Sequence, residues 1–314
     1  GAPYRKAAGA SFAPGRGGAG RGVGDGRADR LLDALAGEGP VDLVSDYAHP
    51  LTCGHTCSLL GVPEGELGVW SERLGRLDGG YLRWVGADLE SPELGDDGAW
   101  LLRAVDRLLD RGDGLAGRLA AVGGGGPGDG AGEGDRRGFL RDLLLLLLYA
   151  GHQNMVNFLS LAVFNLCRHP ELVRRLRREP SRLPDAVLEL MRYDSPVQYL
   201  PLVARDAIDV GGERIGPGDE ILISVGAANR DPEVFPNPDR IDLDRRPREQ
   251  LSFGWGPSRC MGAQLAVSQG AAALGAWLAR TEAFELTGEE LRWRTVPAVQ
   301  RGLHALPLDV RWRS

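Results

Sequence analysis

The sequence predicts a mainly α-helical fold with small β-sheets. Long segments repeat apolar residues at helical spacing, whereas short β-like stretches occur only after residue 200. A run of leucines at 143–148 lies in the longest helical segment, but the polar residues on both sides leave far fewer than the ~18 apolar residues that span a membrane. A helix that is apolar all round its middle is typical of the core of a large domain.

The chain is predicted to begin with a flexible Gly/Arg-rich arm, 1–27, followed by a single domain, 28–314. Seven glycines between positions 15 and 26 disfavour a helix in the arm and supply little apolar surface to bury. Helical spacing begins at residue 28 and returns over 42–60 and 100–122. Eight glycines between positions 123 and 134 then predict a flexible linker, 123–135.

The central helix is expected over 136–167, and the leucine run forms its buried middle. An arginine-rich helix follows Pro170, and another helix is expected over 184–193. Short strands are expected at 202–210 and 220–225, where glycine-containing turns separate β-like stretches. A loop-rich stretch leads to a last helix from about Gly262, and terminal strands close the chain.

The charge balance excludes a protein that attracts nucleic acid or anionic membranes through its overall field. The chain carries 43 acidic and 37 basic residues, for a formal charge of −6. Its first residues contain no charged segment followed by an apolar one, so we expect a cytoplasmic protein. Four arginines after Pro170 form either a solvated face or a docking surface for an acidic partner: Arg174, Arg175, Arg177 and Arg178.

Cys260 lies in the sequence Phe-Gly-Trp-Gly-Pro-Ser-Arg-Cys-Met-Gly, after an irregular segment and at the start of a helical pattern. Backbone N–H groups and the positive end of a helix can hold a sulfur as thiolate there, and glycines let the chain pass close to a flat ligand. A lone cysteine is also commonly a small buried apolar residue. From the loop alone, ligation and simple burial both remain open.

The loop and several other segments resemble the cytochrome P-450 family, in particular its bacterial members of secondary metabolism. The Phe-Gly-x-Gly-x-x-x-Cys-x-Gly pattern is similar to the family's haem-binding loop. Glu189 and Arg192 resemble its Glu-x-x-Arg pair, and Arg240 resembles the arginine that completes this structural ion-pair network. The resemblance extends from about Tyr4 to Trp312 and implies a cytochrome P-450 fold that lacks its N-terminal portion.

The resemblance also implies a cofactor, haem b, with Cys260 as the ligand of its iron. The cofactor-binding residues that it implies are Cys260, Phe253, Gly254, Gly256, Gly262, Arg5 and Ala150. It further suggests an apolar substrate lining, made of Pro201, Leu202, Val203, Val296 and Val299.

The central helix departs from the family's pattern at the oxygen side of the haem. The family usually has an acid followed by a hydroxyl residue after an Ala-Gly pair, and this chain has Gln153 and Asn154 after Gly151. Side-chain amides form hydrogen bonds but do not titrate near neutral pH. We therefore expect non-standard proton delivery by Gly151, Gln153 and Asn154, with His152 facing away from the haem. Ser258 and Leu202 also replace cationic partners of the haem propionates.

Two functions remain open from the sequence. The first is a haem-thiolate monooxygenase of bacterial natural-product biosynthesis, an enzyme that hydroxylates or oxidatively couples a hydrophobic small molecule. It would receive electrons from a ferredoxin-type redox partner or use peroxide. The alternative is a haem-free auxiliary protein of the same fold that binds and stabilises a glycosyltransferase in antibiotic biosynthesis.

Two further features have structural interpretations. Cys53, His55 and Cys57 do not share one helix face and have no fourth ligand nearby in the sequence, so we expect buried thiols rather than a metal site. Trp255, beside the cysteine loop, is expected to be a packing residue. Cys167 is expected in the core.

Overall fold

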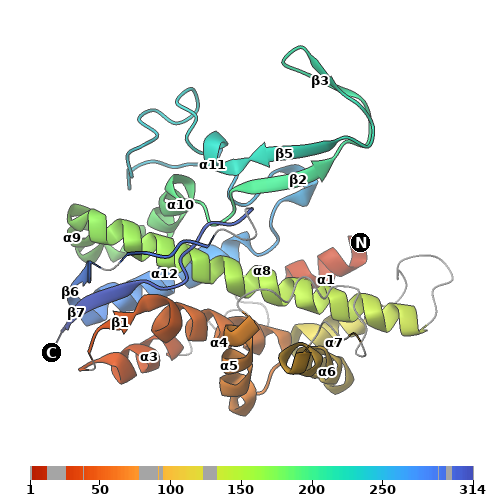
Figure 1. The fold of residues 1–314 in the computed structure, drawn as a ribbon, viewed down its shortest axis with the longest axis horizontal. Helices are drawn as coiled ribbons and strands as arrows, with labels where there is room; N and C mark the ends of the chain where they lie inside the picture. The colour runs from red at the N-terminus through yellow and green to blue at the C-terminus, as the bar shows by residue number, and fades with distance from the viewer. Residues whose placement is uncertain are drawn as a thin grey trace.

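The computed structural model describes residues 2–12, 26–37, 39–77, 91, 95–122, 133–288, 290–294 and 299–313. Helices dominate this part of the chain, and the sheets are small, as the sequence predicts. The long helix α8 crosses the molecule, and the strands β2 to β5 project from one side of it (Figure 1). No helix among the described residues is long and apolar enough to cross a membrane.

The longer helices before the middle of the chain are α1 (Ala2–Phe12), α3 (Arg27–Leu35), α4 (His49–Leu60), α5 (Leu67–Leu77), α6 (Gly95–Arg111) and α7 (Gly114–Ala120). Those that follow are α8 (Glu133–Arg168), α9 (Pro170–Arg178), α10 (Leu183–Tyr193), α11 (Val225–Ala228) and α12 (Ala263–Arg280). A π-helical turn, Leu43–Ala48, leads into α4, and the Asp42 carboxylate accepts a hydrogen bond from the Val44 N–H at its start.

The strands form three small antiparallel sheets. Their bounds are β1 (Val41–Asp42), β2 (Tyr199–Val203), β3 (Ile208–Val210), β4 (Glu213–Ile215), β5 (Glu220–Ser224), β6 (Thr281–Leu286) and β7 (Pro307–Trp312). One sheet has the order β1-β7-β6, and the other two are the pairs β2-β5 and β3-β4. In the β2-β5 pair, Tyr199 lies opposite Ser224 and Val203 opposite Glu220. The hairpin of β3 and β4 extends this pair away from the helices (Figure 1).

Two clusters of buried apolar side chains form the core, and α8 passes through both. Leu140 to Tyr149 contribute to a cluster with α1, α5, α6 and α7, and Met155 to Leu166 contribute to a second one with α10, α12 and β7. This division explains why the helix is apolar on every side in its sequence: each half is surrounded by different elements. Residues 150–154 lie at the junction between the two clusters.

The N-terminal segment differs from the expected flexible arm. Residues 2–12 form helix α1, in which Tyr4 and Ala8 are buried one turn apart. The Tyr4 ring contacts the Phe139 ring of α8 with centroids 5.1 Å apart. The glycines that suggested an arm begin at residue 15, and those from 15 to 25 lie outside the described residues, so composition averaged over 1–27 concealed a short amphipathic helix.

The predicted linker, 123–135, is also shorter than expected at its end. Helix α8 begins at Glu133, three residues inside the predicted linker, and residues 123–132 lie outside the described part of the chain. The acidic Asp135 stands in the first turn of the helix, where a carboxylate interacts favourably with the helix dipole.

The four arginines of α9 divide into two kinds. Arg175 pairs with the Asp244 carboxylate at 2.7 Å, and Arg177 donates hydrogen bonds to the carbonyl oxygens of Leu278 and Glu282. These two side chains therefore fasten α9 to neighbouring segments. Arg174 and Arg178, one turn apart, are exposed.

Candidate functional site

The Cys260 loop is a compact, hydrogen-bonded turn before α12. The Cys260 N–H donates to the Phe253 carbonyl at 2.7 Å, and the Gly254 N–H donates to the Leu251 carbonyl at 2.8 Å. Gly254 and Gly256 adopt φ angles of 68° and 61°, in the left-handed region that favours glycine. Two of the glycines in the motif are therefore required by the turn itself, whatever ligand it meets.

The turn leaves the Cys260 thiol exposed and unpaired with another cysteine. Partial desolvation by the surrounding chain raises the pKa of this thiol, while the Gly262 backbone N–H and the charges of Arg5 and Arg259 act in the opposite direction. Arg5 lies beside the loop because its guanidinium donates a hydrogen bond to the Arg259 carbonyl. A bound metal cation would supply the positive charge that converts such a thiol to thiolate.

Helix α8 exposes one stripe at the junction of the two core clusters. Leu146 is 49% exposed, Ala150 is exposed and Asn154 is half-buried, at intervals of one turn. On another side of the helix, Gly151 lies so close to α4 that an added Cβ would be 3.0 Å from the Thr56 Cγ2 atom. Gly151 thus serves the packing of α8 on α4, whereas Ala150 and Asn154 are accessible.

These residues fit a flat, iron-bearing group such as haem. The cysteine loop adjoins both core clusters, since Phe253 packs against one and Met261 against the other. An exposed thiol and an exposed apolar stripe of α8 therefore flank the same junction. Haem, the cofactor that the resemblance of the cysteine loop implies, would have Cys260 as its iron ligand and Ala150 among the residues that hold it.

The Glu189 and Arg192 side chains form a fully buried, two-pronged ion pair on α10. Arg192 Nε lies 2.9 Å from Glu189 Oε2, and Arg192 Nη2 lies 2.9 Å from Glu189 Oε1. The remaining guanidinium hydrogens go to backbone carbonyls, those of Asn229, Pro238 and Arg240. A buried pair needs this complete set of partners to offset its desolvation.

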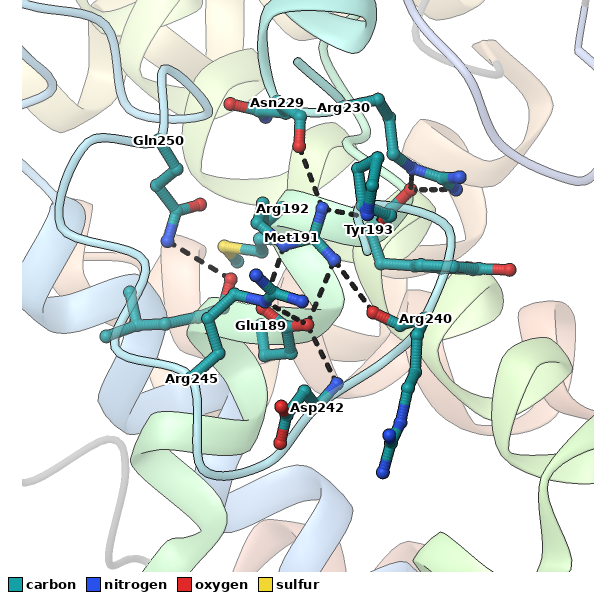
Figure 2. Close-up of polar contacts among 12 residues, drawn as sticks. Glu189, Met191, Arg192, Tyr193, Asn229, Arg230, Arg240, Asp242, Arg245 and Gln250 are labelled. Carbon is teal, nitrogen blue, oxygen red and sulfur yellow. Dashed lines mark hydrogen bonds and ion pairs between the residues drawn. The ribbon is translucent and has the colours of Figure 1, made fainter. Parts of the chain in front are cut away.

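The arginine that completes the network is Arg245, and the expectation for Arg240 is wrong. Arg245 Nε lies 3.1 Å from Glu189 Oε1, while Arg240 contributes only its backbone carbonyl. Figure 2 shows the Arg240 side chain pointing away from Glu189. Both arginines lie in an irregular segment, where sequence spacing does not indicate which side chain turns inward.

The ion-pair network continues into the cysteine loop through Asn229. The Asn229 carbonyl accepts from Arg192, its side-chain Oδ1 accepts from the Leu251 N–H at 2.7 Å, and its Nδ2 donates to Ser252 Oγ at 2.9 Å. Leu251 and Ser252 directly precede Phe253. No local pattern in the sequence marks Asn229 as a positioning residue, because its role depends on contacts between segments more than 20 residues apart.

Gln153 and Asn154 belong to a directed chain of side-chain amides. Gln153 Nε2 donates to Asn157 Oδ1 at 3.3 Å, Asn157 Nδ2 donates to Gln300 Oε1 at 3.4 Å, and Gln300 Nε2 donates to Asn154 Oδ1 at 2.7 Å. Gly302 backs this chain, since a Cβ there would lie 2.2 Å from Asn157 Oδ1. Asn154 consequently uses its oxygen within the protein, and its NH₂ hydrogens have no acceptor in the described part of the chain.

His152 faces α4 and contacts a second histidine. Its Nε2 lies 3.0 Å from His49 Nδ1, and His49 Nε2 lies 2.8 Å from the Ser71 carbonyl oxygen. A carbonyl only accepts, so His49 carries its proton on Nε2 and accepts at Nδ1 from the His152 Nε2–H. Burial, followed by the nearby His49 and Arg294, holds the pKa of His152 well below its usual value of 6.5.

This histidine pair predicts a loss of stability in mild acid. Below pH 6.5 His152 takes up a proton in the unfolded chain but stays neutral in the folded chain. The free energy of unfolding should therefore fall as the pH drops, by up to about 1.4 kcal/mol per pH unit. Urea unfolding between pH 7.5 and 5.5 should show a shallower fall in His152→Gln. The partly exposed His169→Gln should keep the wild-type slope, and equal slopes in all three proteins would contradict the assignment.

The proposed substrate-lining residues fall into separate places. Pro201, Leu202 and Val203 are exposed on β2, and Leu202 and Val203 are 46% and 61% exposed. Val299 is half-buried, and its carbonyl accepts a hydrogen bond from the Gln198 N–H at 2.8 Å. It directly precedes Gln300 and therefore lies next to the chain of side-chain amides. Val296 lies outside the described residues.

The remaining expectations give a mixed result. Cys53 and Cys57 are fully buried with their Sγ atoms 3.8 Å apart, and burial raises the pKa of Cys57. No group of metal-ligating side chains occurs within the described ranges. Cys167 is only partly buried at the edge of the core. Trp255 is 73% exposed, so its expected packing role is wrong.

Comparisons with known proteins agree with this geometry. The family profile described as Cytochrome P450 matches residues 137–291. The chain is 35% identical over 296 residues to the 6-deoxyerythronolide B hydroxylase of Saccharopolyspora erythraea, covering 88% of this chain and 68% of the relative. It is 34% identical over 293 residues to the pentalenic acid synthase of Streptomyces avermitilis, covering 89% and 68%.

Solved structures give the same result for the fold. A crystal structure of P450BioI in complex with an acyl carrier protein that bears hexadec-9Z-enoic acid aligns with a TM-score of 0.81 at 28% identity. The alignment covers 99% of this chain and 79% of that one. Together with the exposed cysteine on its glycine-rich loop and the buried Glu189–Arg192 pair, these relatives show that the chain belongs to the cytochrome P450 family.

Proposed function

We propose that the protein is a haem-thiolate monooxygenase that oxidises a hydrophobic small molecule in bacterial natural-product biosynthesis. The observation that carries the proposal is the exposed Cys260 thiol, held by a hydrogen-bonded turn at the same junction of core clusters as the accessible stripe of α8. Relatives named 6-deoxyerythronolide B hydroxylase and pentalenic acid synthase support this class of substrate.

Bound haem supplies the oxygen chemistry, and its iron receives electron density from the cysteine thiolate. The chain's own residues hold the iron ligand in place and line the space for the substrate. The Glu189–Arg192–Asn229 network fixes the segment before Phe253, so that Cys260 keeps one position. Leu146 and Ala150 provide an apolar wall that suits a hydrophobic substrate and excludes water.

Proton delivery in this proposal relies on water or substrate hydroxyl groups. Gln153 and Asn154 do not exchange protons near neutral pH, so their amides can only position a proton donor. The chain of hydrogen bonds from Gln153 to Gln300 fixes the Asn154 oxygen and leaves its NH₂ hydrogens without an acceptor among the described residues. Electrons would come from a ferredoxin-type protein, or peroxide would replace both electrons and dioxygen.

The test is turnover of haem-loaded protein with ¹⁸O₂, a ferredoxin and its reductase. Macrolactones such as 6-deoxyerythronolide B, sesquiterpene acids and long-chain fatty acids serve as candidate substrates. We expect one class to shift the haem absorption on binding and to yield a product that contains one ¹⁸O atom. Haem-loaded protein that binds and oxidises none of these classes, with dioxygen or with peroxide, would contradict the proposal.

The amide chain predicts a split between binding and turnover. Asn154→Leu removes the NH₂ donors but keeps an apolar side chain of similar size, so we expect the dioxygen-dependent rate to fall about tenfold or more with little change in substrate affinity. Gln300→Leu should have a smaller effect of the same kind, because it keeps the Asn154 NH₂ group but removes the hydrogen bonds that hold Asn154 and Asn157 in place. Gln264→Leu, on the exposed face of α12, is the matched control and should leave both quantities unchanged.

A further inference from the structure

A polar cavity lies at the end of α8. Its volume is about 300 Å³, room for several water molecules. It is lined by Phe164, Asn165, Arg168, Tyr193, Asp194, Ser195, Gln198, Gly226, Arg230 and Arg301. None of these residues takes part in the haem site or the amide chain described above.

Three arginines from distant segments converge on this cavity, and each is held against an aromatic ring. The guanidinium carbon of Arg168 lies 5.5 Å from the centroid of the Phe164 ring. The guanidinium carbon of Arg230 lies 3.9 Å from the centroid of the Tyr193 ring, and that of Arg301 lies 4.0 Å from the centroid of the Trp293 ring. The Phe164 and Trp293 rings also contact each other edge to face, with centroids 5.5 Å apart. Stacking orients a guanidinium and leaves the N–H groups at its edge available.

Two of the three arginines keep hydrogen-bond donors that have no protein acceptor among the described residues. Arg230 is committed to the Tyr193 carbonyl and to Asp239. Arg301 uses only its Nε, which donates to Asp194 Oδ1 at 2.7 Å, and Asp194 Oδ2 accepts from Asn165. Within the described ranges, neither the terminal nitrogens of Arg301 nor any nitrogen of Arg168 has a protein acceptor.

Ser195 adds an independent sign of an incomplete site. Its side chain is 2% exposed, and its Oγ is buried without a hydrogen-bond partner among the described residues. Buried hydroxyl groups nearly always have a partner, because leaving one unpaired costs free energy. Ser195 thus lines, with an unpartnered hydroxyl, the same cavity as two arginines that keep unused N–H groups, and an oxyanion satisfies such donors.

We propose that this cavity, which Ser195 also lines, binds a small phosphate-bearing anion through the guanidinium edges of Arg168 and Arg301. Planar guanidinium edges match the oxygens of phosphate. Arg168 has no ion-pair partner among the described residues, and Arg301, whose Nε pairs with Asp194, keeps the free edge of its terminal nitrogens. Free phosphate and a phosphate monoester of a small molecule carry the same recognised group. Titrations with each distinguish these two sources.

The test is isothermal titration calorimetry of the whole chain with inorganic phosphate and with glycerol phosphate, at an ionic strength kept constant with sodium chloride. We expect one saturable site for at least one of them. Arg168→Gln should weaken binding about tenfold or more without affecting folding, because Arg168 makes no ion pair among the described residues. Arg301→Gln should weaken it as well, and Arg214→Gln, on the exposed β4, should bind as the wild type does.

Saturable binding distinguishes a site from the general stabilisation that phosphate salts give to proteins by exclusion from their surface. Absence of saturation with both anions would overturn the proposal. Equal affinity in wild type and Arg168→Gln would overturn it too. The readout does not depend on haem, so a colourless preparation tests it equally well.

Discussion

Replacing Glu189 with Gln should lower the free energy of unfolding by about 3–5 kcal/mol, the cost of leaving a buried charge without its partner. Both side chains of the Glu189–Arg192 pair are fully buried, and Glu189 also accepts from the Asp242 N–H and from Arg245. The variant removes the charge but not the volume, so packing changes little. Urea unfolding followed by circular dichroism measures the difference from wild type.

A matched pair of arginine variants tests which side chain completes the network. Arg245→Gln loses a charged hydrogen bond to Glu189 and should cost about 1.5–3 kcal/mol. Arg240→Gln keeps the backbone carbonyl that Arg192 uses and changes only an exposed side chain, so its cost should stay within about 0.5 kcal/mol. A larger cost for Arg240→Gln than for Arg245→Gln would show that the network differs from Figure 2.

Replacing Cys260 with Ser should abolish the thiolate-type absorption of the reduced carbon monoxide complex, because a serine hydroxyl does not replace a thiolate as a ligand of haem iron. The hydrogen bonds that shape the loop involve backbone atoms and remain in the variant. Folding should therefore be unchanged, and circular dichroism checks this.

The other cysteines supply the controls for this experiment. Cys167→Ser changes a partly buried thiol in the second half of α8, and Cys53→Ser changes a buried thiol of α4. Both variants should keep the spectrum of the wild type. If Cys260→Ser also kept it, another residue would be the iron ligand and the assignment of Cys260 would be wrong.

The sequence was sufficient for the helical fold and for the central helix, because apolar spacing is a local property and α8 has the strongest pattern. It also predicted that Glu189 and Arg192 share a helix face, since residues at i and i+3 are neighbours on any helix. The exchange of Arg240 for Arg245, and the roles of Asn229 and Gln300, depend on how irregular segments fold back on α10 and α8. Spacing along the chain carries no information about such contacts.

Helix α1 and Trp255 show two further limits of the sequence. A glycine-rich composition averaged over 27 residues concealed the buried Tyr4 and Ala8, which need only two turns of helix to reach the core. Trp255 is large and apolar, but the turn at Gly254 and Gly256 directs it to the surface. In both cases local backbone geometry determined burial, and residue type did not.

The central claim is that Cys260 binds the iron of a haem at the junction of the two core clusters. The absorption spectrum of the purified wild-type chain, reduced with dithionite and exposed to carbon monoxide after haem is supplied, tests it directly. We expect a Soret band that moves to the position of thiolate-ligated carbonyl haem, with one haem per chain. A protein that stays colourless when haem is supplied, or whose carbonyl complex lacks the thiolate-type band, would contradict the claim.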